Sequence, residues 1–116
     1  MASAPVIDTR QAVTPELIDE VTHRIVKRFN PRRVILFGSH ARGDARPESD
    51  LDLIVEMETD QRQLERVVNV LSFFGLRLWP LDVLVYTPDE LERDSQIGGR
   101  LPNMVRNEWK VLYERP

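Results

Sequence analysis

Two small residues and a group of carboxylates are the parts of this sequence that could do chemistry. Gly38 and Ser39 directly follow the apolar run 34–37, and after ten intervening residues come Asp50 and Asp52, with a single residue between them. Glycine leaves its backbone open to a phosphate, and a serine hydroxyl can donate a hydrogen bond to a phosphate oxygen. Paired carboxylates hold divalent metal ions. The segment 38–53 is therefore typical of a site for a nucleoside triphosphate and metal ions.

Asp50 and Asp52 lie two residues apart in a predicted strand, so their side chains point to the same side and their backbones lie ~6.6 Å apart. Both can converge on one Mg²⁺ or bridge two, because Mg²⁺ takes oxygen ligands from one or two carboxylates together with substrate phosphates. Asp82, early in a later strand, supplies a third carboxylate if the two strands are neighbours. It could complete the metal site and accept a proton from an attacking hydroxyl. An aspartate inside a strand is unfavourable without a partner, which favours a site role for Asp52 and Asp82.

A second phosphate-binding motif is excluded by one residue. Gly38 and Gly43 have the glycine spacing of a P-loop, but Asp44 stands where that motif has lysine, and a carboxylate there would repel the phosphates. Arg42 and Arg46, in the same segment, are candidates for charge-assisted contacts to the triphosphate. We expect His40 to be a solvated loop histidine, since Mg²⁺ chemistry does not need it.

Helical and strand patterns alternate along the chain and predict the elements that must position these residues. A helix is expected from Thr14-Pro15 to Asn30-Pro31, because Thr caps it and the second proline disfavours helix at the residue before it. A second helix is expected after Thr59 or Asp60. Its predicted buried stripe consists of Leu64, Val67, Val68, Leu71 and Phe74. A third helix begins at the capping box Thr87–Glu90 and is broken near Gly98-Gly99 and Pro102. Strands are predicted at 33–37, 51–57, 81–86 and 110–113.

These elements predict an α/β (α+β) fold in which helices pack on a mixed sheet of about four strands. Alternation groups Asp50 and Asp52 with Ile54 on one face of the sheet, and groups Asp82 with Leu84 and Tyr86 in its own strand. We expect one domain, 14–116, after a loose lead-in of residues 1–13.

Composition narrows the class of protein. The chain has 116 residues, of which 41% are apolar and 30% charged, as in an ordinary globular domain. It has no cysteine, which excludes disulfides and thiolate metal sites. We find neither a signal-peptide pattern nor an apolar run approaching the roughly 18 residues of a membrane span, so we expect a cytoplasmic protein without a membrane partner. The net charge of −3 argues against a nucleic-acid partner.

The chemical motif resembles that of a known superfamily. Gly38-Ser39, ten residues, then Asp50-Leu51-Asp52 is similar to the signature of the polymerase-β-like nucleotidyltransferases. The string GSHARGDARPESDLDL resembles the minimal nucleotidyltransferases, which comprise little more than the catalytic domain. The resemblance covers most of the chain and implies a single-domain nucleotidyltransferase fold that transfers AMP from ATP to a hydroxyl with two Mg²⁺ ions. By position, Gly38 and Ser39 would hold the triphosphate, Asp50 and Asp52 would bind metal, and Asp82 would be the third ligand and base.

The resemblance also implies a partner. Many minimal nucleotidyltransferases resemble antitoxins that adenylylate a HEPN-type toxin encoded beside them, often on a tyrosine. Two alternatives stay open. One is transfer to a small molecule or an RNA end, although small-molecule transferases of this superfamily usually carry an extra domain. The other is neutralisation of a partner by binding alone, without catalysis.

Overall fold

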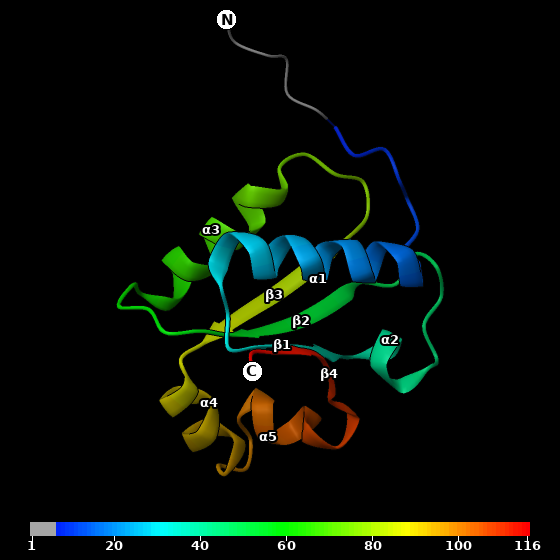
Figure 1. Ribbon diagram of the computed structural model, residues 1–116. Coiled ribbons are helices and arrows are strands. Elements are labelled where there is room, and N and C mark those ends of the chain that lie inside the picture. Colours follow the sequence, from blue (N-terminus) through cyan, green and yellow to red (C-terminus); the bar gives the residue numbers. More distant parts are fainter. Residues whose placement is uncertain (1–6) are drawn as a thin grey trace, which may run out of the picture.

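A computed structural model describes residues 7–116 as a four-stranded sheet between two groups of helices (Figure 1). The elements in chain order are α1 (Pro15–Phe29), β1 (Arg33–Phe37), α2 (Ser39–Arg42), β2 (Leu51–Glu56), α3 (Gln63–Phe74), β3 (Leu81–Tyr86), α4 (Pro88–Ser95), α5 (Leu101–Val105), the 3-10 turn η1 (Arg106–Glu108) and β4 (Lys110–Glu114). The predicted α/β fold and all four predicted strands are confirmed, with end points shifted by one residue in β2 and β4. None of the helices in this range is long and apolar enough to span a membrane.

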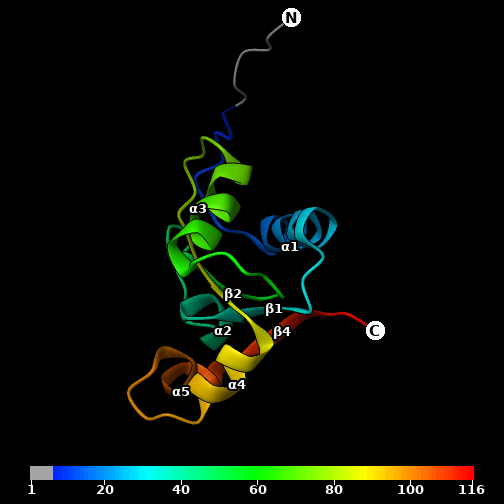
Figure 2. The ribbon, with the colours of Figure 1, turned by 90° about the vertical axis from the view of Figure 1, so that its left-hand side faces the viewer.

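The sheet is mixed and has the strand order β3-β2-β1-β4. β1 runs antiparallel to both β2 and β4, whereas β2 and β3 are parallel and are joined through α3. α1 and α3 cover one face of the sheet, and α4 and α5 lie on the other (Figure 2). Two separate apolar clusters result, one on each face of the sheet.

The helix ends follow the signals in the sequence. Thr14 Oγ1 accepts the N–H of Leu17 at 3.1 Å, and Asn30 closes α1 in the left-handed conformation before a proline. At α4, Thr87 and Glu90 form the predicted reciprocal capping box. The predicted break in the third helix separates α4 from α5.

The prediction for α3 was wrong in its start and in two residues of its buried stripe, while Phe74 is buried and Val67 and Leu71 pack against the core as predicted. The helix begins at Gln63, and its buried residues are Arg66, Val70 and Phe74, whereas Leu64 is 75% and Val68 is 49% exposed. Arg66 is buried on the same side of α3, and its guanidinium donates to the Val85 and Gln61 carbonyls and pairs with Glu90 at 2.6 Å. A periodicity of apolar residues cannot anticipate a buried arginine whose hydrogen bonds are satisfied by partners from other segments.

The N-terminal segment is attached to the domain near Trp79. The N–H of Asp8 donates to the Leu76 carbonyl at 2.9 Å, and Trp79 Nε1 donates to Asp8 Oδ2 at 2.7 Å. Trp79 is almost fully buried. Residues 1–6 of the predicted lead-in lie outside the described residues, and the described part is held by these contacts.

Candidate active site

The register of the parallel strands brings two of the predicted carboxylates together. Asp52 of β2 lies directly opposite Asp82 of β3, and adjacent strands are about 4.8 Å apart. Because Leu51 and Leu53 belong to the cluster under α1 and α3, Asp52 points to the other face, with Ile54. The prediction that these two strands are neighbours is confirmed.

Gly38 lies against the same carboxylate. Phe37 is paired with Asp52 across the antiparallel β1–β2 ladder, so the next residue turns over the Asp52 side chain. A Cβ atom on Gly38 would collide with Asp52 Oδ2 and lie 2.9 Å from its Cγ. The backbone at Gly38 has φ 78° and ψ −160°, a region that only glycine occupies readily. Glycine is therefore required here for both its conformation and its lack of a side chain.

Asp50 lies in the loop before β2, in an exposed position next to the other two carboxylates, so the prediction that it shares a strand with Asp52 was wrong. Arg46 N–H donates to Ser49 Oγ at 2.9 Å, and Ser49 N–H donates to the Arg46 carbonyl at 3.0 Å. His40 Nε2 lies 3.0 Å from the Ser49 carbonyl oxygen, which ties α2 to the residue before Asp50. His40 is thus half-buried and hydrogen-bonded, and our expectation of a solvated histidine was wrong. No local pattern in the sequence signals this contact.

The three carboxylates form an electrostatically unfavourable group. Burial, then the charges of Asp82 and Asp50, raise the pKa of Asp52 to about 6, and the positive charges of His40 and Arg42 partly oppose this shift. A divalent cation would reverse the repulsion and keep the carboxylates ionised. The hard oxygen donors beside an open glycine suit Mg²⁺.

Within residues 7–116, no three carboxylate, imidazole or thiol side chains are arranged to hold a metal ion by themselves. Mg²⁺ does not require three protein ligands, because one or two carboxylates and the substrate phosphates usually complete its shell. The pair Asp52 and Asp82, with Asp50 beside it, fits that mode of binding. The number of metal ions stays a prediction.

Arg42 has other partners in this structure. Its guanidinium donates to Glu108 Oε2 of η1 at 2.8 Å and to Asp44 Oδ2 at 3.3 Å. The contact between Arg42 and a triphosphate stays a prediction, and it would require this exposed side chain to leave at least one of the two carboxylates. Arg46 is exposed in the same loop.

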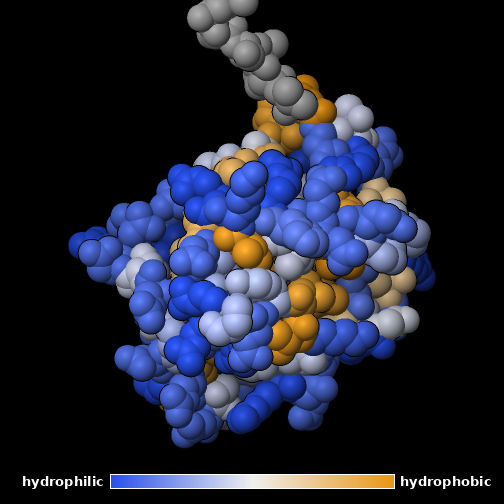
Figure 3. Space-filling view, viewed as in Figure 1, coloured by the Kyte–Doolittle hydropathy of each residue, from blue (hydrophilic) through white to orange (hydrophobic). Residues whose placement is uncertain are grey.

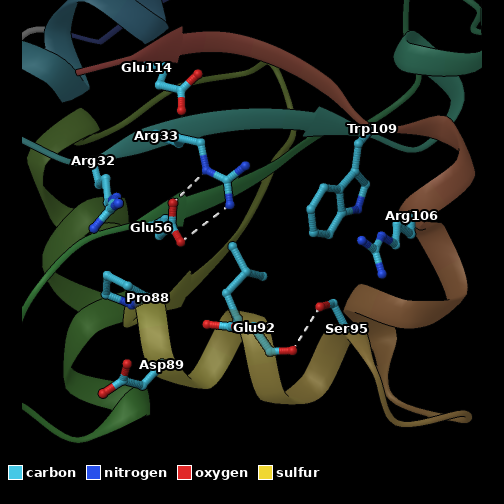
Figure 4. A pocket seen from close by; sticks show the side chains of 11 residues that line it. Arg32, Arg33, Glu56, Pro88, Asp89, Glu92, Ser95, Arg106, Trp109 and Glu114 are labelled. Atoms are coloured by element: carbon cyan, nitrogen blue, oxygen red, sulfur yellow. Dashed lines mark hydrogen bonds and ion pairs between the residues drawn. The ribbon is translucent and has the colours of Figure 1, made fainter. Parts of the chain in front are cut away.

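A cavity of about 410 Å³ lies on the same face of the sheet as Asp52 (Figure 4). At one side Arg33 pairs with Glu56 at 2.6 Å, and Trp109 lies at the other side. Glu56 is four residues from Asp52 along β2, roughly 13 Å. Sequence reasoning missed this ion pair, because only the β1–β2 register places Arg33 opposite Glu56. Trp109 Nε1 is buried without a hydrogen-bond partner in the described part of the chain.

Comparisons with known proteins agree with this geometry. The profile of the family described as "Nucleotidyltransferase domain" matches residues 18–114, which include every candidate site residue. A proposed protein adenylyltransferase of Methanocaldococcus jannaschii is 39% identical over 56 residues, or 46% of this chain and 52% of that protein. The match thus spans about half the length of this relative. The crystal structure of a proposed nucleotidyltransferase from Sulfolobus solfataricus has the same fold, with a TM-score of 0.61 and 22% identity over 86% of this chain and 79% of that one.

Proposed function

Because this chain belongs to the nucleotidyltransferase domain family, we propose that it transfers AMP from ATP to a hydroxyl group in a Mg²⁺-dependent reaction. The observation that carries the proposal is the pairing of Asp52 with Asp82 beside the side-chain-free Gly38. Two carboxylates next to an open turn are what a metal-bound triphosphate needs.

Each candidate residue has a role in this proposal. Asp50 and Asp52 would hold Mg²⁺, with Asp82 as a third ligand. When bound, the metal would neutralise negative charge on the triphosphate and stabilise the departing pyrophosphate. Gly38 would leave room for the phosphates, Ser39 would donate its hydroxyl to a phosphate oxygen, and Arg42 would add a charge-assisted contact.

The reaction balances without any further reactant. The acceptor hydroxyl oxygen forms a bond to the α-phosphorus of ATP, the bond from that phosphorus to its bridging oxygen breaks, and pyrophosphate leaves. The hydroxyl proton passes to the carboxylate of Asp82. Asp82 is exposed, so a hydroxyl carried by a second molecule can reach it.

The acceptor in this proposal is a tyrosine hydroxyl of a partner protein, a HEPN-type toxin, and the chain acts as its antitoxin. The motif's resemblance to minimal nucleotidyltransferases supports this choice. The name of the relative that matches 46% of the chain, a protein adenylyltransferase, also supports it.

The experiment combines the pure protein with ATP, Mg²⁺ and the product of a neighbouring gene, whose intact mass is then measured. We expect a mass gain of one or more adenylates with the wild type. The gain should disappear with Asp52→Asn and Asp82→Asn and remain with Asp60→Asn, which removes an exposed carboxylate outside the site.

The other outcomes separate the alternatives. Neutralisation of the partner by both folded site variants would favour binding without catalysis. If label from ATP is transferred only to RNA or to small molecules, the acceptor is one of these and not a protein. Absence of transfer to any acceptor class would refute the proposed reaction.

A further inference from the structure

Two neighbouring cavities lie between α1 and α3 and share lining residues. The first, of about 510 Å³, is lined by Arg28, Phe29, Met57, Gln61, Asn69, Ser72 and Phe73. The second, of about 330 Å³, shares Arg28 and Phe73 with the first and adds Arg24 and Lys27. We call the combined feature the α1–α3 groove. Since both helices cover the sheet face opposite to Asp52 and Asp82, the groove is separate from the candidate active site (Figure 2).

The charge of the groove differs from that of the whole chain. Arg24, Lys27 and Arg28 line it from α1, and within residues 7–116 no acidic side chain lines either cavity. The chain as a whole has a net charge of −3. Lys27 and Arg28 are exposed, and neither forms an ion pair with another described residue. The α1 wall of the groove is therefore positively charged, and Lys27 and Arg28 in it are exposed to solvent.

The rest of the groove is apolar or neutral. Phe29 and Phe73 pack edge to face with ring centroids 5.6 Å apart, and the Arg24 guanidinium lies 5.2 Å from the centroid of the Phe73 ring. The wall formed by α3 carries Asn69 and Ser72, which can form hydrogen bonds but are uncharged. Seen from the side of α1, the surface is mostly hydrophilic and holds small apolar patches (Figure 3).

The cations of α1 and the phenylalanine rings together indicate what kind of partner can bind in the groove. An amphipathic segment could place apolar side chains on the phenylalanine rings and carboxylates against the α1 cations, which is how a helix binds in a groove between helices. A nucleic acid fits less well, because its affinity comes from many phosphate contacts and the negative chain would repel it. We propose that the α1–α3 groove docks an acidic amphipathic segment of a partner protein. The inference goes beyond the proposed function and does not depend on it, because docking requires neither nucleotide nor metal.

The test is a fluorescence-anisotropy titration of the full chain with a labelled amphipathic helical peptide that has leucines on one face and glutamates beside them. A second peptide replaces every glutamate by lysine, and a labelled oligo-dT strand serves as the nucleic-acid probe. We expect the glutamate peptide to bind, with an affinity that falls as NaCl shortens the range of electrostatic attraction. Neither the lysine peptide nor oligo-dT should bind comparably.

Two variants test both walls of the groove. Arg28→Glu reverses a charge on α1 and should weaken binding by about tenfold, because attraction becomes repulsion. Ser72→Glu adds a carboxylate on α3 and should also weaken it. Both side chains are exposed, so the fold should persist, as circular dichroism would verify. Arg46→Glu makes the same charge change in the distant α2–β2 loop and should leave binding unchanged.

Three results would overturn the inference. They are tighter binding of oligo-dT than of the glutamate peptide, equal binding of the two peptides, or undiminished binding by both folded groove variants. Absence of binding by the glutamate peptide at low salt would overturn it as well. Since no nucleotide is added, these results say nothing about AMP transfer, and the two proposals can fail independently.

Discussion

Replacing Gly38 by alanine should separate backbone strain from damage to the site. Gly38 and Gly75 adopt the same unusual conformation, with φ 78° and ψ −160° at the first and φ 64° and ψ −148° at the second. A non-glycine residue in this region costs about 1–3 kcal/mol, so both Gly38→Ala and Gly75→Ala should lower the free energy of unfolding by that amount.

The surroundings of the two glycines differ. A Cβ at Gly75 would meet nothing within 4 Å, whereas one at Gly38 would lie 2.9 Å from Asp52 Cγ and collide with its carboxylate oxygen. The Asp52 side chain must therefore turn away in Gly38→Ala, by a distance on the order of 1 Å or more. A displacement of that size can reduce catalysis about 100-fold.

Two assays on the same pair of variants give the comparison. Urea unfolding should show similar losses of stability. The kcat/KM for AMP transfer to the acceptor protein should fall about 100-fold in Gly38→Ala and stay near wild type in Gly75→Ala. If folded Gly38→Ala keeps its activity, or if both variants lose activity equally, then Asp52 does not need the space above Gly38 and the reasoning is refuted.

Three further predictions concern stability. Because the pKa of Asp52 in the folded protein is about 6, above its ordinary value, the folded state binds more protons than the unfolded state between about pH 4 and pH 6, and stability falls as the pH rises through that range. The free energy of unfolding of Asp52→Asn should therefore exceed that of the wild type by about 1–2 kcal/mol at pH 7 in metal-free buffer. This is less than the full pKa shift implies, because solvent screens a half-buried carboxylate. Equal urea midpoints at pH 7 would contradict this prediction. Arg66→Met removes the hydrogen bonds to the Gln61 and Val85 carbonyls and leaves Glu90 without its ion-pair partner. Chemical denaturation should therefore show a free energy of unfolding lower by about 3 kcal/mol, and a decrease under about 1 kcal/mol would show that the ion pair is dispensable. Leu91→Ala should lower the free energy of unfolding by about 2–5 kcal/mol because Leu91 is buried, while Leu64→Ala, at an exposed position, should change it by less than about 0.5 kcal/mol. A larger loss in Leu64→Ala than in Leu91→Ala, measured by thermal unfolding, would mean that Leu64 is buried on α3 as the sequence predicted.

The strand-borne part of the site was predictable because its determinants are local. Alternation in residues 51–56 fixes the face to which Asp52 points, and the same rule applies to Asp82 in its strand. Only the adjacency of the two strands had to be assumed, and a helix of α3's length between them is the usual connection of neighbouring parallel strands.

The features that sequence reasoning missed depend on pairs distant in the chain. His40 contacts Ser49 only because the loop folds back on α2, and Arg33 meets Glu56 only through the antiparallel register. Arg66 is buried on α3 because partners on three other segments satisfy its guanidinium. Local periodicity carries no information on such contacts.

The central claim is that Asp52 and Asp82, side by side on parallel strands, hold a metal-bound triphosphate. Isothermal titration with a non-hydrolysable ATP analogue tests it most directly, because binding needs no acceptor. The wild type and the control variant Asp60→Asn, changed outside the site, should bind the analogue when Mg²⁺ is present and should not bind it when a chelator removes the metal. Asp52→Asn and Asp82→Asn should lose this Mg²⁺-dependent binding. Equal affinity in all four proteins, or unchanged binding in the chelator, would contradict the account.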